Sequence, residues 1–326
     1  MISTPTPATT ASTLRVREGL TRERRVALLL HPIRSDAVDA AVAFVTGVAD
    51  YGVCCCLLPE QLSLISQRLP TVQLGMLDGQ WADIELMVVF GGDGTILRAA
   101  EWALPHQVPL LGVNLGHVGF LAEMDVSEIG TLIRQVADRR YEIEERLTLD
   151  VSVLDAAGQL VWNSFAVNEV STEKVSRQKM ADLLVTIDHR PLSRWACDGV
   201  LVSTASGSTA YAFSVGGPVM WPDVEAFEVC PIAAHALFAR PLVVAPDSLV
   251  ELHVMGSDVE TVVVCDGRRT VDVMPGGRVS VRRHDQNLRI ARLSEQPFTT
   301  RLVKKFELNI EGWRGNQGPA TTTAGG

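Results

Sequence analysis

One stretch decides the fold: Leu86-Met87-Val88-Val89-Phe90-Gly91-Gly92-Asp93-Gly94-Thr95. Its first half is a short, unbroken apolar run, which is typical of a strand buried on both faces of a parallel sheet. The glycines that follow predict a tight turn, and Thr95 can cap a helix beginning near it. An apolar stripe at helical spacing continues beyond the turn, formed by Ile96, Leu97, Ala100 and Ala103. The stretch therefore predicts a strand, a glycine turn and a helix.

This turn is also the first candidate site. Open α/β sheets bind ligands beyond the carboxyl ends of their strands. Glycines let a backbone approach a phosphate closely, and the N-terminus of a helix favours an anion. Asp93 does not fit an anion cradle, because a carboxylate repels phosphate. It is predicted to face a hydroxyl group that loses its proton, or a Mg²⁺ ion; the alternative is an Asp that only caps its own turn.

Outward from this stretch, the N-terminal part alternates between strand-like and helix-like patterns. Val26–Leu30, Val53–Leu58 and a run within Pro109–Val113 are further short apolar segments, and residues 36–49 suit a helix. Strands alternating with helices predict a parallel α/β layer.

From about Leu147 the pattern becomes that of short strands separated by turns. Asp266-Gly267 is a hairpin dipeptide, and Tyr141–Arg146, with four charged residues in six, is the expected linker. The expected strands of this mostly antiparallel region are Thr148–Leu154, Leu160–Val170, Leu183–Asp188, Leu249–Met255, Thr261–Cys265, Thr270–Val273, Arg278–Arg283 and Leu288–Leu293.

Composition narrows the function classes. The chain has 326 residues, of which 47% are hydrophobic, so it is long enough for two domains. Its formal net charge of −9 argues against a general nucleic-acid binder, which would normally be basic. No apolar run approaches the length of a membrane span, about 18 residues. The six cysteines form no C-x-x-C motif, which predicts buried, reduced thiols in a cytoplasmic protein.

The resemblance becomes specific when several segments are taken together. Gly91–Thr95 resembles the phosphate-loop signature shared by NAD kinases, 6-phosphofructokinases and diacylglycerol or sphingosine kinases. Asn114–Leu121, Asn168-Glu169 and Asp198–Tyr211 resemble, in order, three further motifs of the NAD kinases. The chain is identified as similar to a bacterial NAD kinase of the actinobacterial type. Ala205-Ser206 stand where the family usually reads Pro-Thr.

The resemblance implies a fold class and domain boundaries. It implies a Rossmann-like α/β N-terminal domain with a parallel sheet, and a mostly antiparallel, all-β C-terminal domain that binds NAD. The expected boundaries are a disordered tail at 1–22, the α/β domain at 23–146, the β-rich domain at 147–293, a segment packing back on the first domain at 294–314, and a second disordered tail at 315–326.

The resemblance further implies phosphoryl transfer to the adenosine 2′-hydroxyl of NAD, which would make the chain a phosphotransferase with an alcohol acceptor. Asp93 would accept the hydroxyl proton, beside the backbone of Gly94. Arg98 could reach a phosphate, although a solvated helix arginine is the alternative. The remaining implied contacts with NAD are Asn168, Glu169, Lys179, Asp198 (toward a neighbouring subunit), Thr209, Ala210, Tyr211, Ala212, Phe213, Ser214 and Arg268, which stands where many relatives carry Gln.

The implied partners are NAD and a phosphate donor, either ATP or inorganic polyphosphate, with a divalent metal (Mg²⁺ or Mn²⁺) and no protein ligand set assigned to that metal. A homo-oligomer, dimer or tetramer, with a site shared between subunits is expected, and neither nucleic acid nor membrane is an expected partner. A dehydrogenase and a Walker-type NTPase are excluded, because the G-x-G-x-x-G and Gly-Lys signatures are absent. A lipid or sphingoid kinase and a non-catalytic NAD(P) sensor remain as alternatives.

Overall fold

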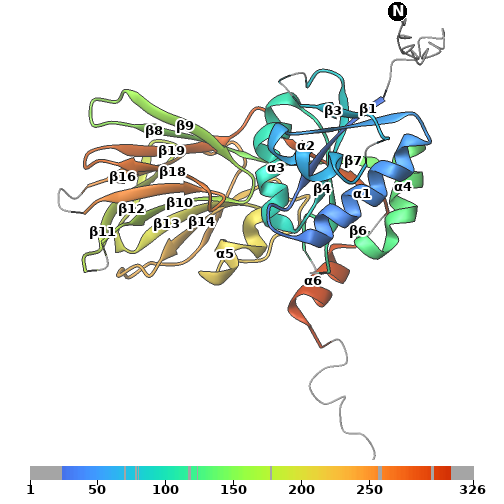
Figure 1. The fold of residues 1–326 in the computed structure, drawn as a ribbon. Coiled ribbons are helices and arrows are strands. Elements are labelled where there is room, and N and C mark those ends of the chain that lie inside the picture. Colours follow the sequence, from blue (N-terminus) through green and yellow to red (C-terminus); the bar gives the residue numbers. More distant parts are fainter. Residues whose placement is uncertain are drawn as a thin grey trace, which may run out of the picture.

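The computed structural model describes residues 24–69, 71–77, 79, 81–116, 119–122, 124–176, 178–255, 259–294 and 297–309. The first part is an eight-stranded sheet with helices on both faces (Figure 1). Its order is β3-β2-β1-β4-β5-β20-β7, with β6 beside β5, and β7 is antiparallel to its neighbour. These strands are β1 (Arg24–Leu30), β2 (Val53–Leu57), β3 (Leu74–Met76), β4 (Ile84–Phe90), β5 (Leu110–Asn114), β6 (Met124–Asp125), β7 (Glu142–Arg146) and β20 (Leu288–Arg292).

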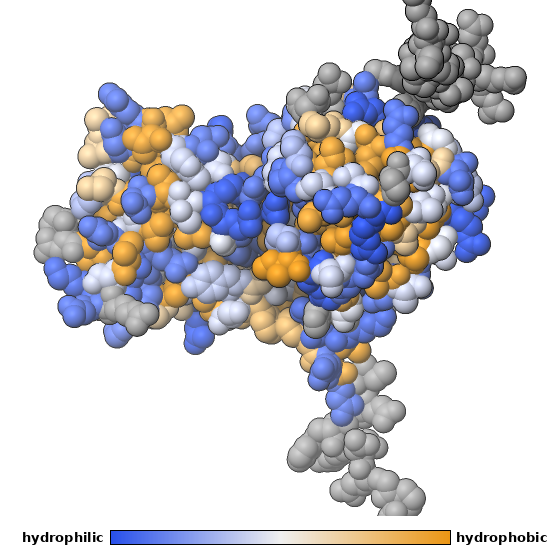
Figure 2. All heavy atoms as spheres, in the orientation of Figure 1, coloured by the Kyte–Doolittle hydropathy of each residue, from blue (hydrophilic) through white to orange (hydrophobic). Residues whose placement is uncertain are grey.

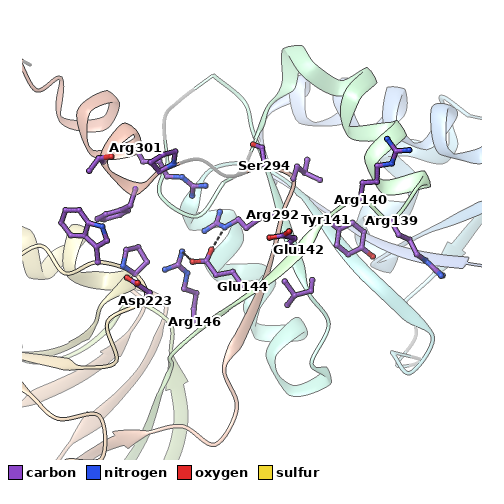
Figure 3. A pocket seen from close by; sticks show the side chains of 17 residues that line it. Arg139, Arg140, Tyr141, Glu142, Glu144, Arg146, Asp223, Arg292, Ser294 and Arg301 are labelled. Carbon is purple, nitrogen blue, oxygen red and sulfur yellow. Dashed lines mark hydrogen bonds and ion pairs between the residues drawn. The ribbon is translucent and has the colours of Figure 1, made fainter.

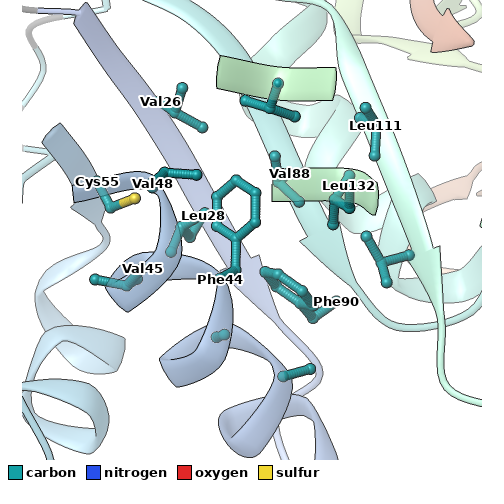
Figure 4. Packing of buried hydrophobic residues seen from close by; sticks show 14 of the residues in the cluster. Val26, Leu28, Phe44, Val45, Val48, Cys55, Val88, Phe90, Leu111 and Leu132 are labelled. Carbon is teal, nitrogen blue, oxygen red and sulfur yellow. The ribbon is translucent and has the colours of Figure 1, made fainter. Parts of the chain in front are cut away.

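The central strands are apolar throughout because both faces of the sheet are covered. Phe44 of α1 (Ser35–Ala49) meets Phe90 of β4 edge to face on one side, with ring centroids 5.8 Å apart (Figure 4). Helix α4 (Ile129–Ala137) covers the same face, and α2 (Pro59–Ser66) packs against α1. Helix α3 (Asp93–His106) covers the opposite face. The helices after β1 and β4 thus lie on opposite faces, which places a crevice between these two strands at their carboxyl ends.

The three adjacent cysteines follow the alternation of a strand. Cys55 lies in the core under α1, whereas Cys54 and Cys56 lie in the core under α3. All six cysteines are buried, and none is in a disulfide.

The second part is a sandwich of two antiparallel six-stranded sheets, and the expected fold class is confirmed. One sheet has the order β15-β14-β13-β10-β17-β18 and the other β12-β11-β16-β19-β8-β9, with an apolar core between them. Their strands are β8 (Leu149–Leu154), β9 (Leu160–Ala166), β10 (Glu169–Lys174), β11 (Ala181–Ile187), β12 (Arg190–Cys197), β13 (Gly199–Thr204), β14 (Phe227–Ile232), β15 (Leu242–Val244), β16 (Val250–Val254), β17 (Thr261–Cys265), β18 (Arg269–Val273) and β19 (Arg278–Arg283).

Two expectations about the connection between the parts are wrong. Residues 141–146 were expected to form a linker, yet 142–146 form β7 at the edge of the first sheet. Leu288–Leu293 was expected in the antiparallel region, yet β20 lies between β5 and β7. The charged side chains of β7 fit an edge strand, and β20 buries Leu288 and Ile290 against the α3 side. The chain therefore leaves the first sheet through β7 and returns beside it through β20.

The start of α3 also differs from expectation. The helix begins at Asp93, with Gly92 as an extended N-cap residue, so Thr95 lies inside the first turn and does not cap it. A Cβ atom on Gly91 would come within 2.3 Å of the Thr95 hydroxyl oxygen. Thr95 therefore packs down onto Gly91.

The last described element is α6 (Phe298–Phe306), whose Arg301 donates a hydrogen bond to the carbonyl of Phe120 in the first part. The expected tails at 1–22 and 315–326 lie outside the described residues. None of the helices in the described ranges has the length and apolar character that crossing a membrane requires.

Candidate functional site

The site is centred on the turn between β4 and α3, at the carboxyl edge of the first sheet. Gly91 is required by the protein itself, because Thr95 fills the space of a side chain. A Cβ on Gly92 or Gly94 would instead meet open space. Internal packing therefore does not explain these two glycines, and a backbone left bare next to a helix N-terminus suits a phosphate-bearing ligand that approaches from outside.

Asp93 is held in one orientation by the loop that follows β5. Its Oδ2 accepts a hydrogen bond from the N–H of Phe120 at 2.9 Å, and its Oδ1 accepts one from the N–H of Leu121 at 3.0 Å. A Cβ on Gly119 would lie 2.4 Å from Oδ1, so this loop can approach only because residue 119 is glycine. A carboxylate has about four lone-pair positions, and these two bonds leave others for a ligand.

The Asn168-Glu169 pair lies in a turn whose backbone N–H groups are bonded to a second acid, Asp266. The buried carboxylate of Asp266 accepts hydrogen bonds from the N–H of Asn168 at 2.7 Å and from the N–H of Val167 at 3.0 and 3.1 Å. Its Oδ2 also accepts a bond from the Nη2 of Arg269 at 2.6 Å. Asp266 thereby fixes the backbone from which the two expected nucleotide contacts project.

The side chains of this pair carry unused polar atoms. Asn168 is 8% exposed and Glu169 is 9% exposed, and neither Asn168 Oδ1 nor Glu169 Oε2 has a hydrogen-bond partner. Burial, with the charge of Asp266 as a second cause, raises the pKa of Glu169 to about 8. Glu169 is thus mainly protonated at neutral pH, and a neutral carboxylic acid can both donate and accept. Such a pair can bind ribose hydroxyls.

The hydroxyl groups at the end of β13 and just after it mainly bond within the protein. The hydroxyl of Thr204 donates to the carbonyl of Val167 at 2.7 Å, and that of Ser208 donates to the carbonyl of Ala205 at 2.8 Å. A Cβ on Gly207 would come within 2.2 Å of the Asn168 carbonyl oxygen. Residues 206–209 therefore form a short 3₁₀ turn, η2 (Ser206–Thr209), pressed against the Asn168-Glu169 turn.

The expected adenosine contacts follow directly on this turn. Helix α5 (Tyr211–Ser214) begins where the Tyr211 backbone N–H bonds to Glu169. Thr209, Ala210 and Tyr211 are partly exposed, Ala212 is buried, and Phe213 and Ser214 are exposed. The structure thus places the stretch 209–214 beside the Asn168-Glu169 pair.

Helix α3 joins the two halves of the site. Val167 packs in the same apolar core as Ile96 and Ala100 of α3. The exposed Arg268 donates from its Nε to Glu101 of α3 at 3.0 Å. Figure 2 shows hydrophilic side chains gathered on this face where the sandwich meets the α/β part.

Of the other expected residues, Arg98 lies on α3 five positions after Asp93, whereas Lys179 and Asp198 lie beyond the end of β10 that is far from Glu169. Arg98 faces Glu60 at 3.9 Å and sits 5.7 Å from the Trp102 ring. Lys179 is exposed in the segment between β10 and β11. Asp198 pairs with Lys174 at 2.5 Å, at the far end of β10 from Glu169, which is about 16 Å along a strand.

Asp266 supports the site without being one of the residues that the sequence singles out as a contact. The sequence predicts only a hairpin turn at Asp266, and the turn is confirmed, since both Asp266 and Gly267 have positive φ angles. The chain also offers a local signal, because a buried Asp before Gly needs partners for its carboxylate. The sequence does not show that these partners are the N–H groups of Val167 and Asn168, because they lie almost a hundred positions earlier in the chain.

Metal binding has no ready-made cluster in the described ranges. They hold no group of three or more His, Cys, Asp or Glu side chains arranged to bind an ion. Asp93, with unused lone pairs, fits the single carboxylate that a Mg²⁺ ion bound through substrate phosphates requires.

The chain matches two family descriptions in sequence order. Residues 60–141 match the ATP-NAD kinase N-terminal domain, and residues 167–293 match the ATP-NAD kinase C-terminal domain. The chain is 53% identical over 293 residues to an NAD kinase of Cutibacterium acnes, covering 89% of this chain and 92% of the relative. It is 45% identical over 303 residues to NAD kinase 2 of Streptomyces coelicolor, covering 90% and 98%.

Two solved structures share the fold. A yeast NADH kinase in complex with NADH superposes with a TM-score of 0.80 at 25% identity, covering 88% of each chain. An NAD kinase from Archaeoglobus fulgidus in complex with ATP superposes with a TM-score of 0.65 at 26% identity, covering 87% of this chain and 98% of the other.

Proposed function

This chain belongs to the NAD kinase family, and from that premise we propose that it transfers a phosphoryl group from ATP to the adenosine 2′-hydroxyl of NAD, giving NADP. The observation that carries the proposal is the orientation of Asp93, the first residue of α3. Its carboxylate is fixed by the backbone N–H groups of Phe120 and Leu121. The lipid or sphingoid kinase and the non-catalytic sensor are not favoured, because the match to NAD kinases extends over most of the chain.

The proposed step is a transfer in which the 2′-hydroxyl oxygen bonds to the γ-phosphorus as the bond from that phosphorus to the bridging oxygen of ADP breaks. Asp93 accepts the hydroxyl proton, and ADP leaves with the electron pair of the broken bond. Phosphoryl transfer depends mainly on positioning and on neutralising charge. A positioned base contributes about 100- to 10,000-fold. The rigid hold on Asp93 suits this role, because its orientation is set before substrate arrives.

Substrate placement follows from the geometry on either side of Asp93. The bare backbone at Gly92 and Gly94 suits the donor phosphates. The unused Asn168 Oδ1 and Glu169 Oε2 suit the hydroxyls and base of the adenosine half of NAD, with 209–214 against that half. Arg98, Lys179 and Arg268 are proposed as outer contacts with the substrates.

A divalent ion, Mg²⁺ or Mn²⁺, is part of the proposal. When bound, the ion would be held mainly by the donor phosphates and would neutralise their charge, which leaves the unused lone pairs of Asp93 for the hydroxyl proton. Inorganic polyphosphate is proposed as a second donor, because it presents the same phosphate chemistry as the tail of ATP.

A site shared between subunits is proposed from the position of Asp198. This residue lies a strand length from Glu169, and it is half-buried beside Lys174. A homo-oligomer, dimer or tetramer, would allow it to reach the NAD of a neighbouring copy. The buried cysteines without disulfides support a cytoplasmic location.

The test is NADP formation from NAD, ATP and Mg²⁺, coupled to an NADP-specific dehydrogenase. Asp93→Asn is expected to lower kcat about 100- to 10,000-fold. Asp50→Asn is the matched control. Asp50 is an exposed acid at the C-terminal end of α1, at the amino edge of the sheet and so away from Asp93. Folded wild-type protein that binds NAD but forms no NADP would contradict the proposal, as would full activity in Asp93→Asn. Replacing ATP with polyphosphate in the same assay tests the second donor.

A further inference from the structure

A single peptide group connects Asp93 to a buried arginine of the C-terminal helix. The peptide between Phe120 and Leu121 has its N–H bonded to Asp93 Oδ1 at 3.0 Å. Its carbonyl oxygen accepts a hydrogen bond from Arg301 Nη1 at 2.8 Å. A trans peptide is planar, with its C=O and N–H pointing in opposite directions, so fixing one end fixes the other. The Arg301 guanidinium and the Asp93 carboxylate therefore lie at the two ends of one rigid, polarised unit.

A second arginine supports the same loop more weakly. Arg292 of β20 donates from its Nη1 to the Leu121 carbonyl at 3.4 Å, and its Nε bonds to Glu144 at 2.6 Å. Glu144 also pairs with the buried Arg146 at 2.6 Å. Figure 3 shows these arginines and Arg301 around one cavity, of about 970 Å³. The residues lining this cavity do not include Asp93, so Arg301 and Asp93 reach the Phe120–Leu121 peptide from different sides.

Helix α6 is seated so that Arg301 can hold this position. The Phe120 ring contacts the rings of both Phe298 and Phe306, at centroid distances of 5.8 and 6.0 Å. Phe306 also meets Phe213 of α5 at 4.7 Å. The helix thus contacts both the loop that holds Asp93 and the stretch proposed to face adenosine. Arg301 is 7% exposed, whereas Lys304, one turn further along, is exposed.

We propose that Arg301 is a positioning residue for the phosphoryl transfer proposed above: through the Phe120–Leu121 peptide it keeps the Asp93 carboxylate aimed at the acceptor hydroxyl. Charge assistance at both ends strengthens the two hydrogen bonds, and each polarises the peptide for the other. A displacement of about 1 Å at a reacting group can cost about 100-fold in rate. Loss of Arg301 therefore affects turnover more than substrate binding.

The test compares Arg301→Met with Lys304→Met, which removes one positive charge from the same helix at an exposed position. Arg301→Met is expected to lower kcat about tenfold to 100-fold with the KM for NAD little changed. Lys304→Met is expected to match the wild type. Arg301→Lys retains a donor and is expected to recover part of the lost kcat. Thermal unfolding and calorimetric NAD binding show that each variant is folded and binds NAD.

A double variant decides whether Arg301 acts through Asp93. If it does, adding Arg301→Met to Asp93→Asn lowers the residual activity no further, measured at high enzyme concentration. An equal further loss in the Asp93→Asn background would overturn the proposal, as would equal kcat values for Arg301→Met and Lys304→Met. If Arg301→Met does not fold, Arg301→Lys carries the same comparison. A wild type that forms no NADP would instead refute the proposed function, so the two failures can be told apart.

Discussion

Asp266 supports the nucleotide-binding turn, and its removal should cost both stability and affinity. In Asp266→Ala, the N–H groups of Val167 and Asn168 lose their acceptor, and Arg269 loses its carboxylate partner. A buried donor without a partner costs about 1–3 kcal/mol, and breaking a buried pair by removing one partner costs about 3–5 kcal/mol. The Arg269 side chain remains partly exposed and its guanidinium lies 4.0 Å from the centroid of the Phe165 ring. The cost of breaking its pair with Asp266 is therefore at the low end of that range, about 3 kcal/mol. The two N–H groups together cost about 2–6 kcal/mol and the broken pair about 3 kcal/mol, so we expect a loss of about 5–9 kcal/mol in the free energy of unfolding.

That loss is comparable to the whole stability of many proteins, about 5–15 kcal/mol, so a milder variant is needed for kinetics. Asp266→Asn keeps one oxygen for the two N–H groups but turns an NH₂ group toward Arg269. We expect it to lose about 2–3 kcal/mol and to raise the KM for NAD more than it lowers kcat.

The measurement is chemical denaturation followed through the tryptophan signal, with NAD titrations on the folded variant. Asp272→Asn is the matched control, because Asp272 is an exposed acid on the next strand of the same hairpin. Surface substitutions of this kind stay within about 0.5 kcal/mol. If Asp266→Ala unfolds within 1 kcal/mol of the control, the proposed support of the 167–169 turn is refuted.

Three further predictions concern the loop, a buried acid and the shared site. Gly119→Ala forces a Cβ toward Asp93 Oδ1 and should lower kcat about 100-fold. Gly130→Ala is the control, because a Cβ at this position of α4 meets open space, and it should leave kcat unchanged. Equal kcat values for the two variants would contradict the prediction. Burial raises the pKa of the fully buried Glu228 to about 7. Its stabilising contribution is therefore complete below about pH 4.5 and is lost as the pH rises through 7, which amounts to about 3 kcal/mol by pH 9. Glu228→Gln should flatten the pH dependence of the unfolding free energy by that amount, and parallel curves would argue against it. Mixed oligomers of Asp93→Asn and Asp198→Ala subunits should regain activity if the site is shared, and no recovery on mixing would refute sharing.

The sequence by itself determined the elements whose cause is local. The apolar run before Gly91 is a buried strand because it leaves no polar face for water. The apolar stripe from Ile96 to Ala103 forms a helix with one face in the core. The glycines, Asp93 and the Asn168-Glu169 pair could be singled out because their motifs are continuous in the chain.

Tertiary structure decided what depends on distant partners. Strand β20 resembles the strands of the second region in sequence, and only its pairing with β5 and β7 assigns it to the first sheet. Asp266 reaches the N–H of Asn168 from 98 positions away, and Arg301 reaches Phe120 across 181. Such contacts depend on how whole helices and strands pack, so no local pattern of hydrophobic or turn residues predicts them. Their favourable free energy is gained only when the distant segments have been brought together in the folded chain.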